Sequence, residues 1–167
     1  MVYLLDASVL ITANNSYYPV ERVPEFWEWL AHQGRIGTMK LPLEIYEEVL
    51  PGRMNDDPLP DWMKGHREAL VLDEAADPAL VQTVVTRGYA PDLTDDELEE
   101  IGRDPFLVAY AMAGAGRCVV TVEPSSPKKQ RQNRRLPDVF ATFGLAACDP
   151  FAVYKALGFS TRWKTTV

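Results

Sequence analysis

The chain has 167 residues, of which 47% are hydrophobic and 25% are charged. This balance excludes a wholly disordered chain, a collagen-like fibre and a disulfide scaffold, and the length suits one domain with one core. The formal net charge is −7, whereas proteins that bind nucleic acids usually carry a basic footprint. The net charge therefore argues against a broad surface for nucleic acids.

Predicted strands and helices alternate along the chain. Short apolar runs predict strands at 2–5, 36–41, 118–122 and 145–148, with a weaker candidate at 70–72. Apolar periodicity, caps and breakers predict helices at 9–13, 21–33, 42–50, 61–69, 77–86, 106–115, 139–143 and 150–157. This order predicts an α/β fold with a mainly parallel sheet. Because the sequence shows neither a repeat nor a linker, we expect residues 1–167 to form a single domain.

The sequence gives no indication of export or of a membrane span. The first residues, MVYLLDASVLITANN, lack a basic segment, and Asp6 interrupts their apolar run, which is not typical of a signal peptide. No apolar stretch reaches the roughly 20 residues of a membrane span. Cys118 and Cys148 lie in apolar surroundings without zinc-site spacing, so we expect buried, reduced thiols. We expect a soluble, cytoplasmic protein that does not bind membranes.

Two acidic residues follow predicted strands directly. Asp6 ends the first apolar run and Glu123 follows the run CVVTV. In parallel sheets ligands collect at the carboxyl ends of the strands. Two carboxylates that converge there repel each other unless a cation binds between them, and oxygen ligands favour Mg²⁺ or Mn²⁺. The alternatives are an Asx-turn at Asp6 and a solvated loop position for Glu123.

A third acidic residue, Asp104, opens the predicted helix at 106–115 in the tripeptide Asp-Pro-Phe. Its alternative role is that of a helix N-cap followed by proline. The same tripeptide recurs at Asp149, which we interpret as a cap alone. The tripeptide by itself therefore carries no catalytic information.

The predicted helix at 42–50 offers three further acids, Glu44, Glu47 and Glu48. At about 100° per residue, Glu44 lies opposite the apolar face and is expected in solvent. Glu47 and Glu48 lie on the two borders of that face, from which a carboxylate can reach a cleft. Periodicity does not choose between them.

Charge is segregated along the second half of the chain. Residues 92–104 carry a net charge of −6, and Thr94 with Glu97 fits a helix capping box. Residues 124–137 contain no acid and five basic side chains: Lys128, Lys129, Arg131, Arg134 and Arg135. Two interpretations of the basic segment remain, a solvated loop or a clamp for a phosphate backbone.

Four segments, YLLDASVLI, EEVLPG, DPFLVAYAM and VVTVE, occur in this order and resemble the PIN-domain family of metal-dependent nucleases. The resemblance spans essentially the whole chain. Within the family, the sequence looks most like a compact bacterial subgroup. The resemblance implies a PIN-like three-layer α/β/α sandwich with acids at the carboxyl ends of its strands. Many members are ribonuclease toxins of the VapC type.

The resemblance assigns one residue here to each acid of the family. The four are Asp6, Glu48, Asp104 and Glu123, which would be both the catalytic residues and the ligands of Mg²⁺ or Mn²⁺. Ser8 and Thr121 are the neighbouring hydroxyls, which would orient a carboxylate or a water molecule. The fourth motif has glutamate where the family more often has aspartate.

What the resemblance implies about function is a metal-dependent ribonuclease, the toxin of a toxin–antitoxin pair. One or two ions would activate a water molecule for attack on an RNA phosphodiester. A homodimer and an antitoxin protein lying over the acidic cleft are further implications. Two alternatives remain: a housekeeping nuclease that processes RNA or DNA, and a non-catalytic PIN-like module that binds other proteins.

Overall fold

A parallel β-sheet forms the centre of the molecule. The computed structural model describes residues 1–53 and 56–165. In these residues the sheet has the order β2-β1-β3-β4, and every neighbouring pair is parallel. The strands are β1 (Val2–Leu5), β2 (Met39–Lys40), β3 (Arg117–Val120) and β4 (Ala146–Cys148). The prediction of a mainly parallel sheet is confirmed; β1 has the predicted bounds, whereas the other three strands are shorter than expected.

The register of the two central strands decides which side chains meet at the carboxyl edge. Leu5 of β1 lies opposite Val120 of β3, and the Asp6 amide donates to the Val120 carbonyl at 2.9 Å. Asp6 and Thr121 are therefore the first residues beyond the sheet on adjacent strands. The weak strand candidate at 70–72 is a single parallel bridge between Leu41 and Val71.

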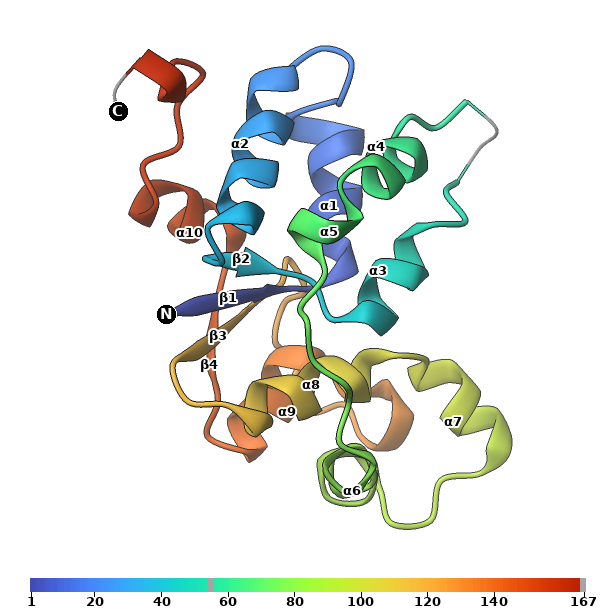
Figure 1. Ribbon diagram of the computed structural model, residues 1–167. Helices are drawn as coiled ribbons and strands as arrows, with labels where there is room; N and C mark the ends of the chain where they lie inside the picture. The colour runs from blue at the N-terminus through green and yellow to red at the C-terminus, as the bar shows by residue number, and fades with distance from the viewer. Residues whose placement is uncertain (54–55, 166–167) are drawn as a thin grey trace.

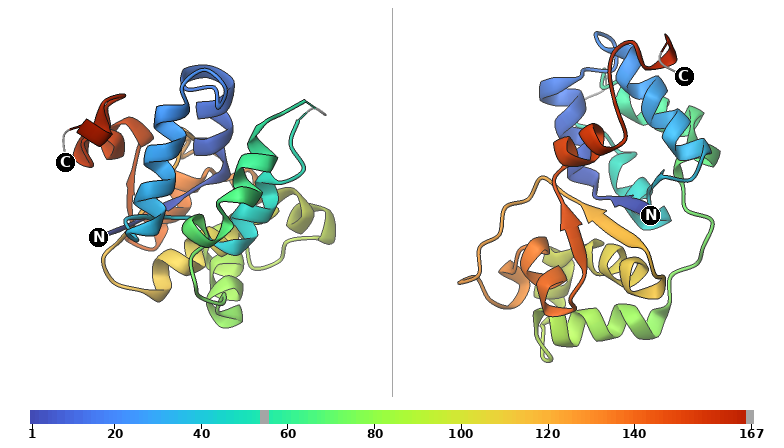
Figure 2. Two further views of the ribbon diagram at one scale, coloured as in Figure 1. Left: turned by 45° about the horizontal axis from the view of Figure 1, so that its top comes forward. Right: turned by 90° about the vertical axis from the view of Figure 1, so that its left-hand side faces the viewer.

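Helices cover both faces of the sheet (Figure 1). One layer contains α1 (Ala7–Thr12), its continuation η1 (Ala13–Tyr17), α2 (Pro24–Arg35), α4 (Leu59–Gly65), α5 (Arg67–Leu70) and α10 (Pro150–Ala156). The other contains α6 (Pro78–Thr83), its continuation η2 (Val84–Tyr89), α8 (Asp104–Ala113) and α9 (Leu136–Thr142). The second view of Figure 2 shows the sheet between the two layers. The expected three-layer α/β/α sandwich is confirmed.

One helix lies beside the carboxyl edge of the sheet. Helix α3 (Leu43–Val49) packs against both α1 and α8. Helix α7 (Asp95–Ile101), which contacts η3, begins with the expected capping box of Thr94 and Glu97. Short 3₁₀ turns, η3 (Arg131–Asn133) and η4 (Trp163–Thr165), complete the described elements. The carboxyl edge is thus bordered by the first residues of α1 and α8 and by one face of α3.

The sheet residues form the middle of one apolar core. Leu4, Leu5, Val119 and Val120 are fully buried, because the carboxyl halves of the two central strands are covered on both faces. The core continues through the side chains of both helical layers. No helix among the described residues is long and apolar enough to cross a membrane.

Some local expectations were wrong. The helix expected at 61–69 is interrupted at His66, which separates α4 from α5. Helix α8 ends at Ala113, before the predicted end. Cys118 and Cys148 are free thiols, as expected, with their sulfur atoms 2.8 Å apart on β3 and β4, but only Cys118 is fully buried.

Candidate functional site

Asp6 lies at the centre of the carboxyl edge, with 6% of its surface exposed. Its Oδ2 accepts hydrogen bonds from the Ser8 hydroxyl at 2.6 Å and the Thr121 hydroxyl at 2.9 Å. Thr121 Oγ1 also accepts the Glu123 amide at 3.1 Å. Ser8 does not cap α1, because Asp6 occupies the N-cap position. The two hydroxyls instead fix the orientation of the Asp6 carboxylate.

Burial makes the charge of Asp6 costly. Removal from water raises the pKa of the Asp6 carboxyl, and the hydrogen bonds from Ser8 and Thr121 oppose this rise only in part. A buried carboxylate of this kind is stabilised by any positive charge that reaches it. Asp6 is the N-cap residue of α1, but the hydrogen bond from Thr121 on the neighbouring strand shows that its carboxylate also has a contact beyond the local turn.

Asp104 has the same electrostatic character and approaches from the opposite helical layer. It is the first residue of α8, whose N-cap is Arg103, and it makes no capping hydrogen bond in the described structure. Burial, followed by the negative charges of Asp6, Glu48 and Glu123, raises the pKa of the Asp104 carboxyl to about 8. Four separately positioned acids therefore act on one another at this edge.

The three glutamates of α3 have different surroundings. Glu47 forms an exposed ion pair with Arg103 at 2.9 Å. Glu44 accepts the Tyr110 hydroxyl at 3.4 Å on one oxygen, while its other oxygen is buried without a partner in the described residues. The expectation that Glu44 lies in solvent was wrong, because α3 packs against α8.

Glu48 is the α3 glutamate that is coupled to the edge of the sheet. Partial burial and the charge of Asp6 raise the pKa of the Glu48 carboxyl, whereas Arg103 lowers it. Of the two candidates left open by periodicity, Glu48 is the one that interacts electrostatically with Asp6 and Asp104.

Glu123 is held by the basic segment that follows it. Arg135 forms an ion pair with Glu123 at 3.2 Å, and about a fifth of the glutamate side chain is exposed. The carboxylate lies close enough to Asp104 to contribute to the raised pKa there. Arg135 therefore balances one of the four acids in the absence of a ligand.

The other basic side chains divide into two groups. Arg131 adopts a left-handed backbone with φ of 56° and forms ion pairs with Asp92 and Glu97, both at 2.8 Å. Arg134 donates to the Gly88 carbonyl and to the Thr142 hydroxyl. Lys128 and Lys129 are exposed and have no polar partner among the described residues. Three of the five predicted phosphate-binding residues thus already have partners within the protein.

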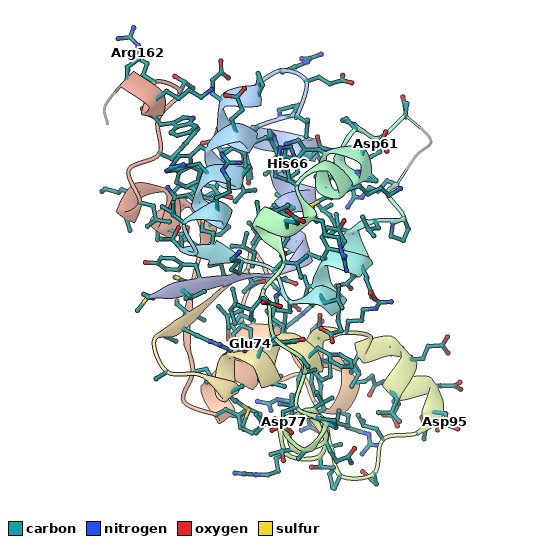
Figure 3. The ribbon with its side chains drawn as sticks, viewed as in Figure 1. Asp61, His66, Glu74, Asp77, Asp95 and Arg162 are labelled. Atoms are coloured by element: carbon teal, nitrogen blue, oxygen red, sulfur yellow. The ribbon has the colours of Figure 1, made fainter. Side chains whose placement is uncertain are left out.

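Most of the acidic segment 92–104 lies away from this edge. Figure 3 labels Asp95, whose side chain projects from the far end of α7 into solvent. Of its acids, Glu97 and Asp92 bind Arg131, and Asp104 belongs to the edge. The rest form a solvated surface.

Tyr89 at the end of η2 is a residue that sequence reasoning missed. Its side chain is 8% exposed, and its hydroxyl is buried without a hydrogen-bond partner in the described structure. Burial and the charges of Asp104, Glu123 and Asp6 raise its pKa above the usual range. No sequence motif marks Tyr89, because its position depends on how η2 packs against α8 and α9.

The four acids influence one another electrostatically, but the described side chains do not form a complete metal-binding site. Across residues 1–53 and 56–165, no three acidic, histidine or cysteine side chains surround one point tightly enough to hold an ion as they stand. The donor set itself consists of oxygen atoms, which suits Mg²⁺ or Mn²⁺ better than zinc. Burial is the main cause of the raised pKa values of Asp6, Glu48 and Asp104, and the negative charges of neighbouring acids add to the shifts at Glu48 and Asp104.

Comparison with known proteins places the chain in a family without assigning an activity. No protein of curated function matches it. A single family description, "Domain of unknown function (DUF4411)", matches residues 3–161, which is nearly the whole chain. The protein therefore belongs to the DUF4411 family.

Proposed function

We propose that the protein is a divalent-cation-dependent ribonuclease and the toxin of a toxin–antitoxin pair. The observation that carries the nuclease proposal is the convergence of Asp6, Glu48, Asp104 and Glu123 at the carboxyl edge of β1 and β3. The toxin role is supported by the resemblance of the four acidic motifs to VapC-type PIN domains. An antitoxin and a second copy of the chain are the partners that this resemblance implies.

Mutual repulsion among the acids supports a cation as the missing component. Without one, Asp104 holds a proton near neutral pH, since its pKa is raised to about 8. Asp6 is buried and Asp104 is partly buried, which is costly for carboxylates that serve only as a cap or a solvated surface. When bound, Mg²⁺ or Mn²⁺ would supply the activated water and the positive charge that phosphodiester hydrolysis needs.

Each residue has a definable role in this proposal. Asp6 would hold the ion through the oxygen that the two hydroxyls leave open, because Ser8 and Thr121 both donate to Oδ2. Asp104 would lose its proton when the ion binds, and Glu48 would close the site from α3. Glu123 would exchange part of its pairing with Arg135 for contact with the ion or its water.

A few basic side chains near the acids are available to bind the phosphates of an RNA strand. Lys128 and Lys129 follow Glu123 by a few residues and are exposed, so they can neutralise backbone phosphates. Arg135 becomes available for a phosphate when Glu123 turns toward the ion. This local basic charge is compatible with the net charge of −7.

Metal-dependent cleavage tests the proposal directly. Single-stranded RNA incubated with the protein and Mn²⁺ should be cut, and EDTA should abolish the cutting. Asp6→Asn should lose cleavage with an unchanged circular dichroism spectrum. Asp95→Asn, an exposed acid at the far end of α7 (Figure 3), should cleave at the wild-type rate. Cleavage by Asp6→Asn would refute the assigned site.

The toxin role needs a separate experiment. Induced expression in bacterial cells should arrest growth for the wild type and spare it for Asp6→Asn, and a small protein encoded beside the gene should restore growth. RNA cleavage in vitro without growth arrest would favour a housekeeping nuclease. An intact fold with neither activity would favour a protein-interaction module.

A further inference from the structure

The sheet brings the side chains of the two cysteines of the chain into contact. In the parallel pairing of β3 with β4, Cys118 lies opposite Ala146, and Cys148 lies opposite Val120. Because residues two apart on a strand share one face of the sheet, both thiols project from the same face. Their sulfur atoms are 2.8 Å apart, closer than the roughly 3.5–4.0 Å of an ordinary contact between carbon atoms. The fold therefore holds two free thiols close to bonding distance.

The two thiols differ in their access to solvent. Cys118 is 6% exposed and lies on a central strand. Cys148 is half-buried and lies on the edge strand β4, whose other residues, Ala146 and Ala147, are exposed. A reagent in solution therefore reaches Cys148 first, and Cys118 is placed to react with whatever forms on the Cys148 sulfur.

We propose that Cys118 and Cys148 form a reversible disulfide by exchange with a low-molecular-weight disulfide such as oxidised glutathione. The Cys148 thiolate attacks one sulfur of oxidised glutathione, whose disulfide breaks and releases one glutathione thiolate. Cys118 then loses its proton and attacks the Cys148 sulfur, which expels the second glutathione thiolate. The protein is oxidised by two electrons, and oxidised glutathione takes up these electrons and the two thiol protons as two molecules of reduced glutathione. The disulfide does not depend on the proposed nuclease function.

The register of the two strands favours a reversible bond over a permanent one. Cys118 and Cys148 are two positions out of register, so a bond between them crosses the ladder diagonally and spans more backbone than one between directly paired residues. Edge strand β4 pairs with β3 alone, so it is the strand that can move to close the remaining gap. Disulfides away from the preferred backbone spacing are strained and more easily reduced.

The bond would also act on the acidic edge, through one residue. The Thr121 amide donates to the Cys148 carbonyl at 3.3 Å, and the Thr121 hydroxyl donates to Asp6 at 2.9 Å. Movement of β4 therefore shifts the acceptor that holds Thr121. This consequence rests on the proposed function: oxidation should raise the Mn²⁺ dissociation constant by about threefold or more, because the residues that orient metal ligands contribute to metal affinity.

Intact-mass spectrometry of the folded protein after incubation with oxidised glutathione tests the disulfide. Burial and the contact with Cys118 raise the pKa of the Cys148 thiol to about 12, which makes the exchange slow, so the incubation runs overnight at mildly alkaline pH. Wild-type protein should lose two hydrogen atoms and regain them with dithiothreitol. Cys118→Ser should retain one glutathione on Cys148, whereas Cys148→Ser should stay unmodified because Cys118 is buried.

Two results for the wild type would overturn the proposal. One is a stable glutathione adduct without loss of the hydrogen atoms. The other is a folded protein that stays unmodified while the same protein unfolded in urea reacts. Glutathione on Cys148→Ser at the rate seen for Cys118→Ser would overturn the order of attack.

Electron paramagnetic resonance of Mn²⁺ with the oxidised and reduced protein measures the effect on the acidic edge. Cys148→Ser treated with the same oxidant is the control and should keep its Mn²⁺ affinity. Equal affinity in the oxidised and reduced wild type would refute the link through Thr121. Reduced wild type that neither binds Mn²⁺ nor cuts RNA would overturn the proposed function, whereas the mass measurement would still decide the disulfide.

Discussion

The same tripeptide, Asp-Pro-Phe, begins two helices of this protein and has a different role in each. At α10, Asp149 is the N-cap, and its exposed carboxylate accepts the Ala152 amide at 3.1 Å. At α8 the register is shifted by one residue, so that Asp104 lies inside the first turn, caps nothing and is partly buried beside other acids. Identical local sequence thus gives a capping carboxylate at the end of the edge strand β4 and, beside the central strands, a carboxylate whose pKa is raised.

The strongest expected contrast between the two aspartates is in activity. Asp104→Asn should reduce RNA cleavage by at least about 100-fold, because a carboxylate in contact with the ion contributes more than the outer residues that orient such ligands. Asp149→Asn should retain cleavage close to the wild-type rate. Initial rates in Mn²⁺ check both variants. Equal losses of RNA cleavage in Asp104→Asn and Asp149→Asn would mean that the two aspartates do not differ in function.

The pH dependence of stability should separate the same two residues. The Asp104 pKa rises from 3.8 in the unfolded chain to about 8 in the folded protein, so the folded state retains a proton that the unfolded state releases. Stability without metal should therefore fall as the pH rises from about 4 to 8. Asp104→Asn should flatten this slope and stabilise the protein at pH 8 by at least about 1.4 kcal/mol, the value of one pKa unit.

Urea unfolding in EDTA at several pH values measures this effect. Part of the slope should remain in Asp104→Asn, because the shifts at Asp6 and Glu48 have the same sign. Asp149→Asn should keep the wild-type slope. A pH dependence unaltered by Asp104→Asn would contradict the buried, proton-holding state of this residue.

In stability, unlike activity, substitution of Asp149 should cost more than substitution of Asp104. Asp149→Ala removes the acceptor for the Ala152 amide and should lower the free energy of unfolding by about 1 kcal/mol. Asp104→Ala removes no capping hydrogen bond and should not destabilise the protein at pH 8 by this route. Urea unfolding at pH 8 compares the two variants. A loss of about 1 kcal/mol in Asp104→Ala but not in Asp149→Ala would mean that Asp104, not Asp149, is the capping residue.

The smallest expected effect concerns Lys128 and Lys129 and the salt dependence of RNA binding. Replacing both Lys128 and Lys129 with glutamine should reduce the slope of log binding constant against log salt by about 1.4, or about 0.7 for each phosphate contact with a single strand. Lys155→Gln on α10 is the control and should leave the slope unchanged. RNA binding to the Asp6→Asn protein at several salt concentrations measures both, and an unaltered slope in the double variant would make the lysines a solvated loop.

Sequence alone could place the centre of the fold and part of the candidate site. The apolar runs before Asp6 and Glu123 predict strands, and parallel strands bring their carboxyl ends to one edge, so a meeting at this edge was predictable. Because β3 ends at Val120, Thr121 rather than Glu123 is the first residue beyond the strand. The capping box at Thr94 was predictable because it is local. Both cases depend on contacts along one strand or one helical turn.

The remaining features depend on packing between distant segments. Neither the burial of Asp104 nor the choice of Glu48 over Glu47 follows from periodicity, because both depend on how α3 lies against α8. Arg131 was a candidate for binding RNA, but it pairs with Asp92 and with Glu97 of α7, which are more than 30 positions away. Tyr89 carries no local signal, since its π-turn and its packing against α9 arise only in the folded molecule.

The register of β1 and β3 also sets an order of events during synthesis. The Thr121–Asp6 hydrogen bond joins residues 115 positions apart, and such long-range pairing closes a large loop and forms slowly. A nascent chain that has reached Asp104 already contains three of the four acids but has no β3 to gather them. The four carboxylates therefore come together, and repel one another, only after the central strands have paired. By then most of the protein has emerged from the ribosome.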